Sequence, residues 1–375
     1  MRLSGVDTDL ARNENFEIGV PVWLLSDENW VDIQRGRLER PQGVPAADVA
    51  WLQYFEEARY IQYKLKPNIS VDASNPFNEI EMQKGRTFRL ASNGDGFRTS
   101  ELRPKPDDVI RIVTLGDSST FGWGVDPEYT YQRLLEDRLN NGATEVEVLN
   151  LGIPGHTTRH GMAMFDHYAR ALDPDLVVLQ FGANDARFVL QSTDELLALD
   201  DTWRGAVRSL LMRFETFRLI RRLIFSAFDP FAASRARAER EGDERRLVES
   251  VPRDTYMENL AHLVTQARAI GAETVILGVC IPAAAYLRGM QYVADTELVP
   301  LIDGGALFRD KVDDLRAHRL YADEVSFYEA LYGRSEMEAN WRLYVTTDGC
   351  HPGRAGHSLL ADALQDAVGE VGLLE

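Results

Sequence analysis

From Arg111 onward, short runs of β-branched and other apolar residues alternate with segments of helical periodicity. The runs are IRIVTLG, VEVLNLG, DLVVLQFG and AETVILGVCIP, and the helical segments include TYQRLLEDRLN, HGMAMFDHYARAL and AGHSLLADALQDAVGEV. Strands of five or six apolar residues separated by helices indicate a parallel sheet that is covered by helices on both faces. The pattern therefore predicts an α/β fold with a three-layer α/β/α core.

The residues before this core have a different character. DVAWLQYFEEARYIQYKL has the apolar spacing of a helix that stops before Pro67, and NEIEMQKGRTFRLASNGDGFR alternates like a hairpin around a Lys-Gly turn. We expect an N-terminal α+β annex over residues 1–105, followed by the core over residues 106–375.

Two helical insertions are expected within the core, at about residues 190–255 and 283–345. The first carries apolar residues at helical spacing between Trp203 and Phe228, together with six arginines. We favour packing of this apolar face against the body of the protein over a role as an acyl-binding lid or as a membrane contact. The second insertion is rich in tyrosine and charge, and we expect it to form a wall of the active site.

The composition and net charge of the chain limit the kinds of molecule that it can bind and the compartment in which we expect it. The chain of 375 residues is 45% hydrophobic, which allows a substantial core, and its net charge of −18 argues against nucleic acid. The first twenty residues contain no apolar signal segment, and no later window approaches the ~18 apolar residues of a membrane span. We expect a cytoplasmic location, although a removed export signal would leave the same sequence.

The chain contains two cysteines, Cys280 and Cys350. We expect both to be free thiols rather than a disulfide, because cytosolic bridges are rare. No cluster of cysteine and histidine has metal-ligand spacing. Neither a metal nor another cofactor is expected.

Polar residues follow the predicted strands at the point where each strand ends. Because the carboxyl ends of parallel strands meet at one edge of a sheet, these residues are expected to converge on one crevice. They are Ser118 in GDSST, Gly152 in NLGIPG and Asn184 in FGANDA, and they are joined near the C-terminus by Asp348 and His351 in TTDGCHPGRAGH.

A serine hydroxyl becomes a good nucleophile when a base takes its proton and a third group orients that base. Asp348 and His351 are three residues apart, a spacing that can bring the carboxylate to the imidazole Nδ1 and leave Nε2 for Ser118. The candidate donors of an oxyanion hole are the N–H of Ser118, the N–H of Gly152 and the amide of Asn184. Taken singly, Gly152 also fits a turn and Asn184 a helix N-cap. Asp117 is expected to be a structural hydrogen-bonding residue.

These blocks resemble those of the SGNH hydrolases, also called the GDSL esterase/lipase family, over about residues 111–187 and 272–371. The resemblance implies a flavodoxin-like fold and hydrolysis of esters through an acyl-serine intermediate. It also implies that Ser118, Gly152, Asn184 and His351 are the four residues of the family motif, with Asp348 as the orienting acid. The segment NGDGFR resembles one that precedes this core in some bacterial members, and no chemistry is assigned to it.

Other chemistries fit the sequence less well. An α/β-hydrolase needs Gly-x-Ser-x-Gly, and a P-loop needs a lysine that GDSSTFGWG lacks. An acyltransferase that moves the acyl group to a sugar or another hydroxyl with the same triad remains open, as does a non-catalytic binding module on the same fold. The expected substrate is a small-molecule or carbohydrate ester with a short acyl group such as acetyl.

Overall fold

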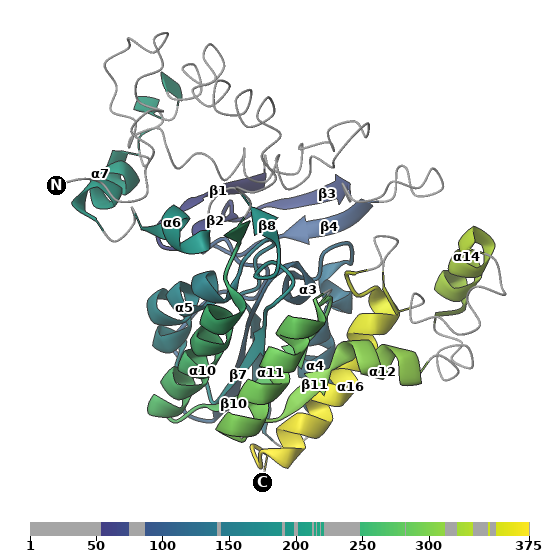
Figure 1. The fold of residues 1–375 in the computed structure, drawn as a ribbon. Coiled ribbons are helices and arrows are strands. Elements are labelled where there is room, and N and C mark those ends of the chain that lie inside the picture. The colour runs from purple at the N-terminus through teal and green to yellow at the C-terminus, as the bar shows by residue number, and fades with distance from the viewer. Residues whose placement is uncertain are drawn as a thin grey trace.

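The computed structural model describes residues 54–74, 87–140, 144–189, 192–198, 202–211, 214, 216–217, 219–220, 248–281, 283–311, 321–332, 344–345 and 350–374. Within these ranges the central sheet consists of β5 (Val109–Gly116), β6 (Glu145–Asn150), β7 (Leu176–Gln180), β10 (Glu273–Gly278) and β11 (Leu301–Asp303). The strands are parallel and lie in the order β11-β10-β7-β5-β6 (Figure 1). Each of the four sequence runs that predicted a strand forms one.

The strand order places β5, the first strand of the sheet in the chain, between β6 and β7. Ile112 of β5 pairs with Val148 of β6 on one side and with Leu176 of β7 on the other. This is the doubly wound, flavodoxin-like order, in which the chain runs outward from β5 in both directions. The predicted fold class is therefore confirmed, and its switch point lies at the carboxyl end of β5.

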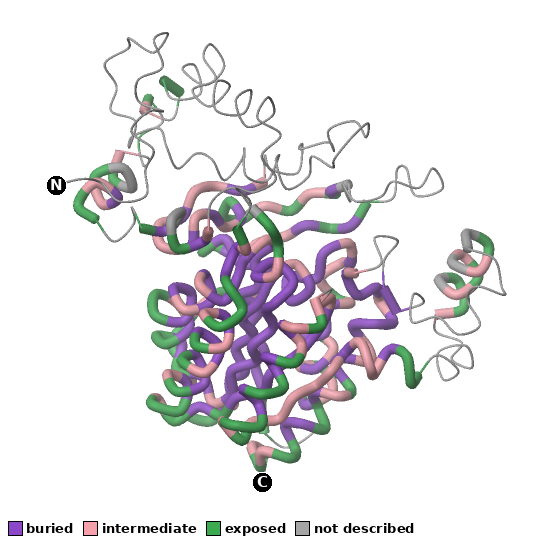
Figure 2. The backbone as a smooth tube through the Cα atoms, viewed as in Figure 1, coloured by how far each residue is buried: buried purple, intermediate pink, exposed green. Residues whose placement is uncertain are grey.

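Helices cover both faces of the sheet (Figure 1). One layer contains α5 (Thr158–His167), α10 (Arg253–Ala269) and α11 (Ala284–Glu297), and the other contains α4 (Tyr131–Leu139), α12 (Gly304–Asp310) and α16 (Arg354–Glu370). Val177 and Leu179 face the first layer, whereas Leu176 and Val178 face the second. All four side chains are buried, as a strand covered on both sides requires, and Figure 2 shows the sheet as the buried centre of the molecule.

The described part of the annex begins with an antiparallel hairpin of β1 (Phe55–Ala58) and β2 (Gln62–Leu65). The helix predicted from the apolar spacing of this segment is therefore wrong over its described part. Ile61, Tyr63 and Leu65 are buried at every second position, and the rings of Phe55 and Tyr63 meet edge to face at 5.9 Å. This alternation has the period of a strand, and aromatic residues pack well on a pleated surface.

A second hairpin pairs β3 (Ser70–Ser74) with β4 (Thr87–Ala91). The expected Lys-Gly turn lies outside the described residues, and the described partner of β4 is β3. The annex packs over the carboxyl end of β5, since the ring of Phe55 lies 6.4 Å from that of Phe121, and Phe88 lies 5.6 Å from Trp123. The annex therefore belongs to the same hydrophobic core as one face of the sheet.

The remaining described elements are of two kinds: some lie within the ranges expected to be insertions, and others connect elements of the core. They are η5 (Pro127–Tyr129), η6 (Ala169–Leu172), β8 (Phe188–Val189), α6 (Thr193–Leu197), α7 (Trp203–Leu211), β9 (Val248–Glu249) and α14 (Ala322–Tyr332). β8 pairs with β9, and β11 extends the main sheet from within the second range. The division into an annex, a core and two insertions stays a prediction.

The apolar face of α7 does not pack as expected. Trp203 is 68% exposed and Leu210 is 54% exposed, and Val207 between them is also exposed. The expectation that this face packs against the body of the protein is therefore wrong for α7, which lies away from the central sheet (Figure 1). Across the part of the chain that the structure covers, no helix combines the length and apolar character needed to cross a membrane.

Candidate active site

Ser118 begins a one-turn helix, α3 (Ser118–Phe121), that follows directly on β5. Asp117 caps this helix by accepting a hydrogen bond from the N–H of Ser119 at 2.8 Å, which is the structural role predicted for it. A Cβ atom on Gly116 would lie 2.1 Å from the Oγ1 of Thr120. The strand can therefore turn into the helix only with glycine at this position.

His351 meets Ser118 at this edge of the sheet. Its Nε2 atom lies 2.7 Å from the Oγ of Ser118, and the imidazole is buried. His351 sits just before α16, in a segment held by the bridge between Val345 and Pro352. The structure thus brings Ser118 and His351, which are 233 residues apart in the sequence, into contact. Asp348 lies outside the described residues.

The two cysteines form a disulfide between Cys280, just after β10, and Cys350, with Cα atoms 4.8 Å apart. The expectation of free thiols is therefore wrong. It relied on the rarity of cytosolic bridges, and a separation of 70 residues gave no sign that the fold brings the two together. The bond links Cys350, the residue before His351, to Cys280 at the carboxyl end of β10.

Gly152 lies where the ends of β5 and β6 approach each other. A Cβ atom on Gly152 would lie 2.5 Å from the backbone nitrogen of Phe121, so no side chain fits there. The N–H of Gly152, an expected oxyanion donor, donates to the Oδ1 of Asn150 at 2.9 Å. The Nδ2 of Asn150 donates in turn to the carbonyl of Thr120 at 3.0 Å, which links this strand end to α3.

Asn184 follows β7 and is buried beside Asp117. Its Nδ2 donates to the Oδ2 of Asp117 at 3.2 Å and to the carbonyl oxygen of His156 at 3.1 Å. The amide therefore lies at the same edge of the sheet as Ser118, with its orientation fixed by two protein acceptors.

Two carboxyl groups beneath this edge have raised pKa values. Burial raises the pKa of Asp117 to about 6, against the opposing effects of the Ser119 N–H and of the charges on His351 and Arg187. Burial also raises the pKa of Asp185 to about 7, although its Oδ1 accepts hydrogen bonds from the backbone and hydroxyl of Thr158. Both carboxyls therefore change protonation state within one or two pH units of neutrality.

The sequence analysis missed a buried polar network in which Gln180 and Tyr131 contact Thr120 of α3. The Oε1 of Gln180 accepts from the Oγ1 of Thr120 at 3.0 Å, and the hydroxyl of Tyr131 donates to the same Oγ1 at 3.1 Å. The available signal was a glutamine at the end of the apolar run LVVLQ, because a polar side chain in a fully buried strand needs a partner.

This arrangement places a hydroxyl against a basic imidazole, with an amide and a close-packed glycine at the neighbouring strand ends. Within the described ranges, no group of three or more His, Cys, Asp or Glu side chains could hold a metal ion. A serine paired with a histidine at the switch point of a doubly wound sheet is the arrangement of a serine-dependent acyl hydrolase. The chain belongs to the GDSL-like lipase/acylhydrolase family, whose profile matches residues 114–359.

The chain is also similar to individual proteins. An arylesterase of Vibrio mimicus is 36% identical over 75 residues, a match that covers 20% of this chain and 38% of that relative. Among solved structures, TesA is 19% identical, with a TM-score of 0.41 and coverage of 70% of this chain and 99% of that one. An acetylxylan esterase, Axe2 of Geobacillus stearothermophilus, is 18% identical, with a TM-score of 0.39 and coverage of 69% and 94%.

Proposed function

We propose that this protein is a serine esterase that hydrolyses carboxylic esters through an acyl-serine intermediate. The observation that carries the proposal is the 2.7 Å contact between the Nε2 of His351 and the Oγ of Ser118, in a chain of the acylhydrolase family. At this distance the imidazole is within hydrogen-bond reach of the proton that it has to remove.

In the first half of the reaction, the Oγ of Ser118 attacks the ester carbonyl carbon while its proton passes to the Nε2 of His351. The tetrahedral intermediate collapses when His351 returns that proton to the leaving alcohol, and the acyl group stays on Ser118. In the second half, water attacks the acyl-serine and gives its proton to His351. The carboxylic acid leaves as Ser118 regains a proton.

The oxyanion formed in both halves needs donors, and we assign the N–H groups of Ser118 and Gly152 and the amide of Asn184. In the resting structure the Gly152 N–H bonds to Asn150, and the Asn184 amide bonds to Asp117 and to the His156 carbonyl. These acceptors hold the donors in place before substrate arrives. The oxyanion then shares or replaces the weaker contacts, such as the 3.2 Å bond from Asn184 to Asp117.

Asp348 is assigned the role of orienting His351. A carboxylate three residues before the histidine can accept a hydrogen bond from its Nδ1 and stabilise the imidazolium that forms during attack. An Asp348→Asn variant is expected to lose up to about 10⁴-fold in kcat, because the wrong tautomer of the histidine is then favoured. Retention of most of the activity would remove Asp348 from the triad.

The proposed substrates are small-molecule or carbohydrate esters with a short acyl group such as acetyl. The similarity of one segment to an arylesterase supports aryl esters as the first substrates to try. A series of 4-nitrophenyl acetate, butyrate and octanoate reports the preferred acyl length. Adding a sugar acceptor separates hydrolysis, which gives free acid, from transfer, which gives an acylated sugar.

The decisive experiment compares the wild type with Ser118→Ala. A fluorophosphonate probe should label the wild type at Ser118, as located by peptide mass, and label Ser118→Ala no more than heat-denatured protein. Wild-type turnover in the Ser118→Ala variant would overturn the proposal. Absence of both turnover and labelling in the wild type would favour a binding module on the same fold.

A further inference from the structure

The NGDGFR segment, residues 93–98, folds into a tight turn at the end of the annex. The Oδ1 of Asn93 accepts hydrogen bonds from the N–H of Asp95 at 3.0 Å and of Phe97 at 2.9 Å. Gly96 has φ +79°, and a Cβ atom there would lie 2.2 Å from the carbonyl oxygen of Leu65. The asparagine and the glycine therefore fix the turn, and the residue after Phe97 emerges at a defined place.

That residue is Arg98, which is almost completely buried. Its Nη1 donates to the carbonyl oxygens of Phe121, at 2.9 Å, and of Gly122. Its Nη2 donates to the carbonyl oxygens of Val125 and of Arg89, the latter at 2.9 Å. Of these acceptors, Phe121 is the last residue of α3, the helix that Ser118 begins, and Gly122 and Val125 lie in the turn that follows it.

Besides Arg98, the N–H of Val125 donates to the Gly122 carbonyl at 3.4 Å, and the Nδ2 of Asn150 donates to the Phe121 carbonyl at 3.4 Å. Both contacts are longer than an ordinary N–H···O hydrogen bond, so Arg98 supplies the shorter bonds to these carbonyls. α3 is only one turn long, so its last carbonyls have no partners within the helix, and the chain reverses at Gly122 with φ +80°. Buried carbonyl groups left without donors would cost about 1–3 kcal/mol each. A guanidinium group supplies several N–H donors in a fixed planar fork, which suits a set of converging carbonyls.

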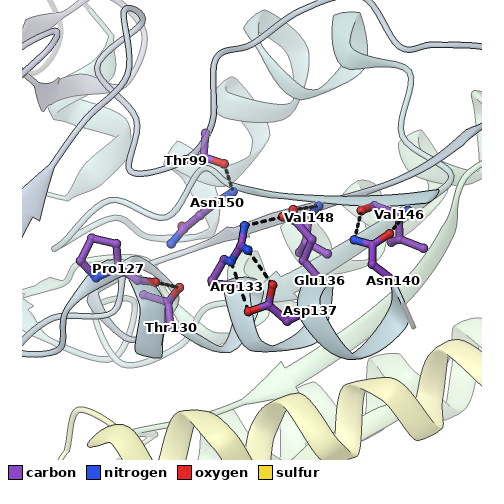
Figure 3. Close-up of polar contacts among 10 residues, drawn as sticks. All are labelled: Thr99, Pro127, Thr130, Arg133, Glu136, Asp137, Asn140, Val146, Val148 and Asn150. Carbon is purple, nitrogen blue, oxygen red and sulfur yellow. Dashed lines mark hydrogen bonds and ion pairs between the residues drawn. The ribbon is translucent and has the colours of Figure 1, made fainter. Parts of the chain in front are cut away.

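The next residue holds the other side of the same junction. The Oγ1 of Thr99 accepts a hydrogen bond from the backbone N–H of Asn150 at 3.1 Å, as Figure 3 shows. The side chain of Asn150 in turn binds the carbonyl of Thr120 and the N–H of Gly152. Arg98 and Thr99 together therefore hold both the turn after Ser118 and the strand end before Gly152.

Arg98 binds these carbonyls without a carboxylate partner. Across the described part of the chain it forms no ion pair, and burial lowers its pKa to about 9, against the opposing charges of Asp126 and Glu128. Burying a charge is costly unless its donors find acceptors. Here the Nη1 and Nη2 atoms each donate to two carbonyl oxygens, while the Nε has no hydrogen-bond partner within the described structure. The side chain is therefore placed for the geometry of its hydrogen bonds rather than for neutralising a nearby acid.

We propose that Arg98 is a positioning residue for Ser118. By binding the carbonyls of the turn after α3, it fixes the direction from which the Oγ of Ser118 meets the Nε2 of His351. The inference rests on the proposed esterase function and adds a role for the annex: through Arg98, which bonds to neither Ser118 nor His351 in the described structure, it holds the nucleophile in place. A nucleophile displaced by about 1 Å can lose about 10²-fold in rate.

The test uses Arg98→Lys, which keeps the charge and loses the fork, and Arg98→Ala, which loses both. For Arg98→Lys we expect kcat for 4-nitrophenyl acetate to fall by about 10- to 10²-fold while KM changes by less than about two-fold. The rate of fluorophosphonate labelling at Ser118 should fall in parallel. Added guanidinium at low millimolar concentration should restore part of the kcat of Arg98→Ala.

The matched control is Arg111→Lys. Arg111 is fully buried near the opposite end of β5, where it donates to the carbonyl of Leu172 at 2.6 Å and pairs with Glu147 at 2.7 Å. This variant should lower the melting temperature and leave kcat per folded molecule, as measured by circular dichroism, close to wild type.

Wild-type kcat in Arg98→Lys, or an equal loss of kcat in Arg111→Lys, would reject the positioning role. Failure of both Arg98 variants to fold under conditions where Arg111→Lys folds would also count against it, since the role would then be structural. If Arg98→Ala alone fails to fold, Arg98→Lys decides. A wild type that neither hydrolyses esters nor takes the label would instead contradict the proposed function.

Discussion

The Nε2 of His351 lies 2.7 Å from the Oγ of Ser118, across 233 residues of sequence. Ser118 starts α3, the helix after β5, and His351 precedes α16, the last helix of the chain. The fold brings them together because the carboxyl end of β5 and the start of α16 share one edge of the sheet. The hydroxyl and the imidazole are therefore already within hydrogen-bond distance in this structure.

The first prediction concerns this pair. Ser118→Ala and His351→Ala should each lower kcat for 4-nitrophenyl acetate by about 10⁴-fold or more, because either change removes the nucleophile–base unit. Stopped-time assays with folding checked by circular dichroism measure the effect. Ser119→Ala is the control, since Ser119 bonds to Asp117 through its backbone N–H, which the substitution keeps. An active Ser118→Ala together with an inactive Ser119→Ala would move the nucleophile to the neighbouring hydroxyl.

The second prediction concerns the oxyanion hole. Asn184→Ala should lower kcat by about 10²-fold with little change in KM, because the amide donates to the substrate oxygen only once negative charge develops there. Asn140→Ala is a suitable control: the Asn140 amide binds both the N–H and the carbonyl of Val146, near the amino end of β6 (Figure 3). Equal kcat values for the wild type and Asn184→Ala would remove Asn184 from the hole.

The third prediction concerns the disulfide. The bond closes a loop of 70 residues, for which the chain-entropy model gives a stabilisation of about 4 kcal/mol. Reduction by dithiothreitol, which is itself oxidised to its cyclic disulfide as Cys280 and Cys350 become thiols, should lower both the melting temperature and kcat, because the segment before His351 is released. The Cys280→Ser/Cys350→Ser double variant should show both losses without reductant and no further response to it.

A colorimetric thiol reagent shows whether dithiothreitol has reduced the disulfide. If the thiols appear and the melting temperature of the wild type stays the same, the third prediction is contradicted. Disulfides persist in oxidising compartments. Fractionation of the native cells is therefore the direct test of the cytoplasmic location, which stays a prediction.

The elements of the core were predictable because their patterns are strong and local. A strand buried on both faces, such as β7 with LVVLQ, has a continuous apolar run that few other structures produce. The hairpin of β1 and β2 was not predicted, because Phe55, Ala58 and Ile61 are spaced by three residues and imitate a helix. Only the packing of Tyr63 and Leu65 against the core shows the period of two.

Ser118, Gly152 and Asn184 could be proposed together as site residues because each follows a strand, and parallel strand ends converge. Their hydrogen bonds were not predictable, since these depend on contacts between distant segments. No local signal in NGDGFR shows that Arg98 reaches the carbonyls after Ser118. The same is true of the disulfide, because nothing in the spacing of Cys280 and Cys350 tells that the end of β10 lies beside the segment before His351.

The last prediction concerns the pH dependence of stability and rests on Asp185. Burial raises the pKa of Asp185 to about 7 in the folded protein, whereas the unfolded chain has an ordinary value of about 4. The folded state therefore holds a proton that the unfolded state has released, so the contribution of this group to stability is fully present below pH ~4 and is lost as the pH rises to ~7.

Asp185→Asn keeps the acceptor that binds Thr158 and places a neutral amide where the Oδ2 of Asp185 has no hydrogen-bond partner within the described structure. Urea denaturation at pH 5 and pH 8 should show the free energy of unfolding of Asp185→Asn rising relative to wild type between the two values. A difference between variant and wild type that is the same at both pH values, or that falls as the pH rises, would mean that Asp185 is ionised in the folded protein throughout this range.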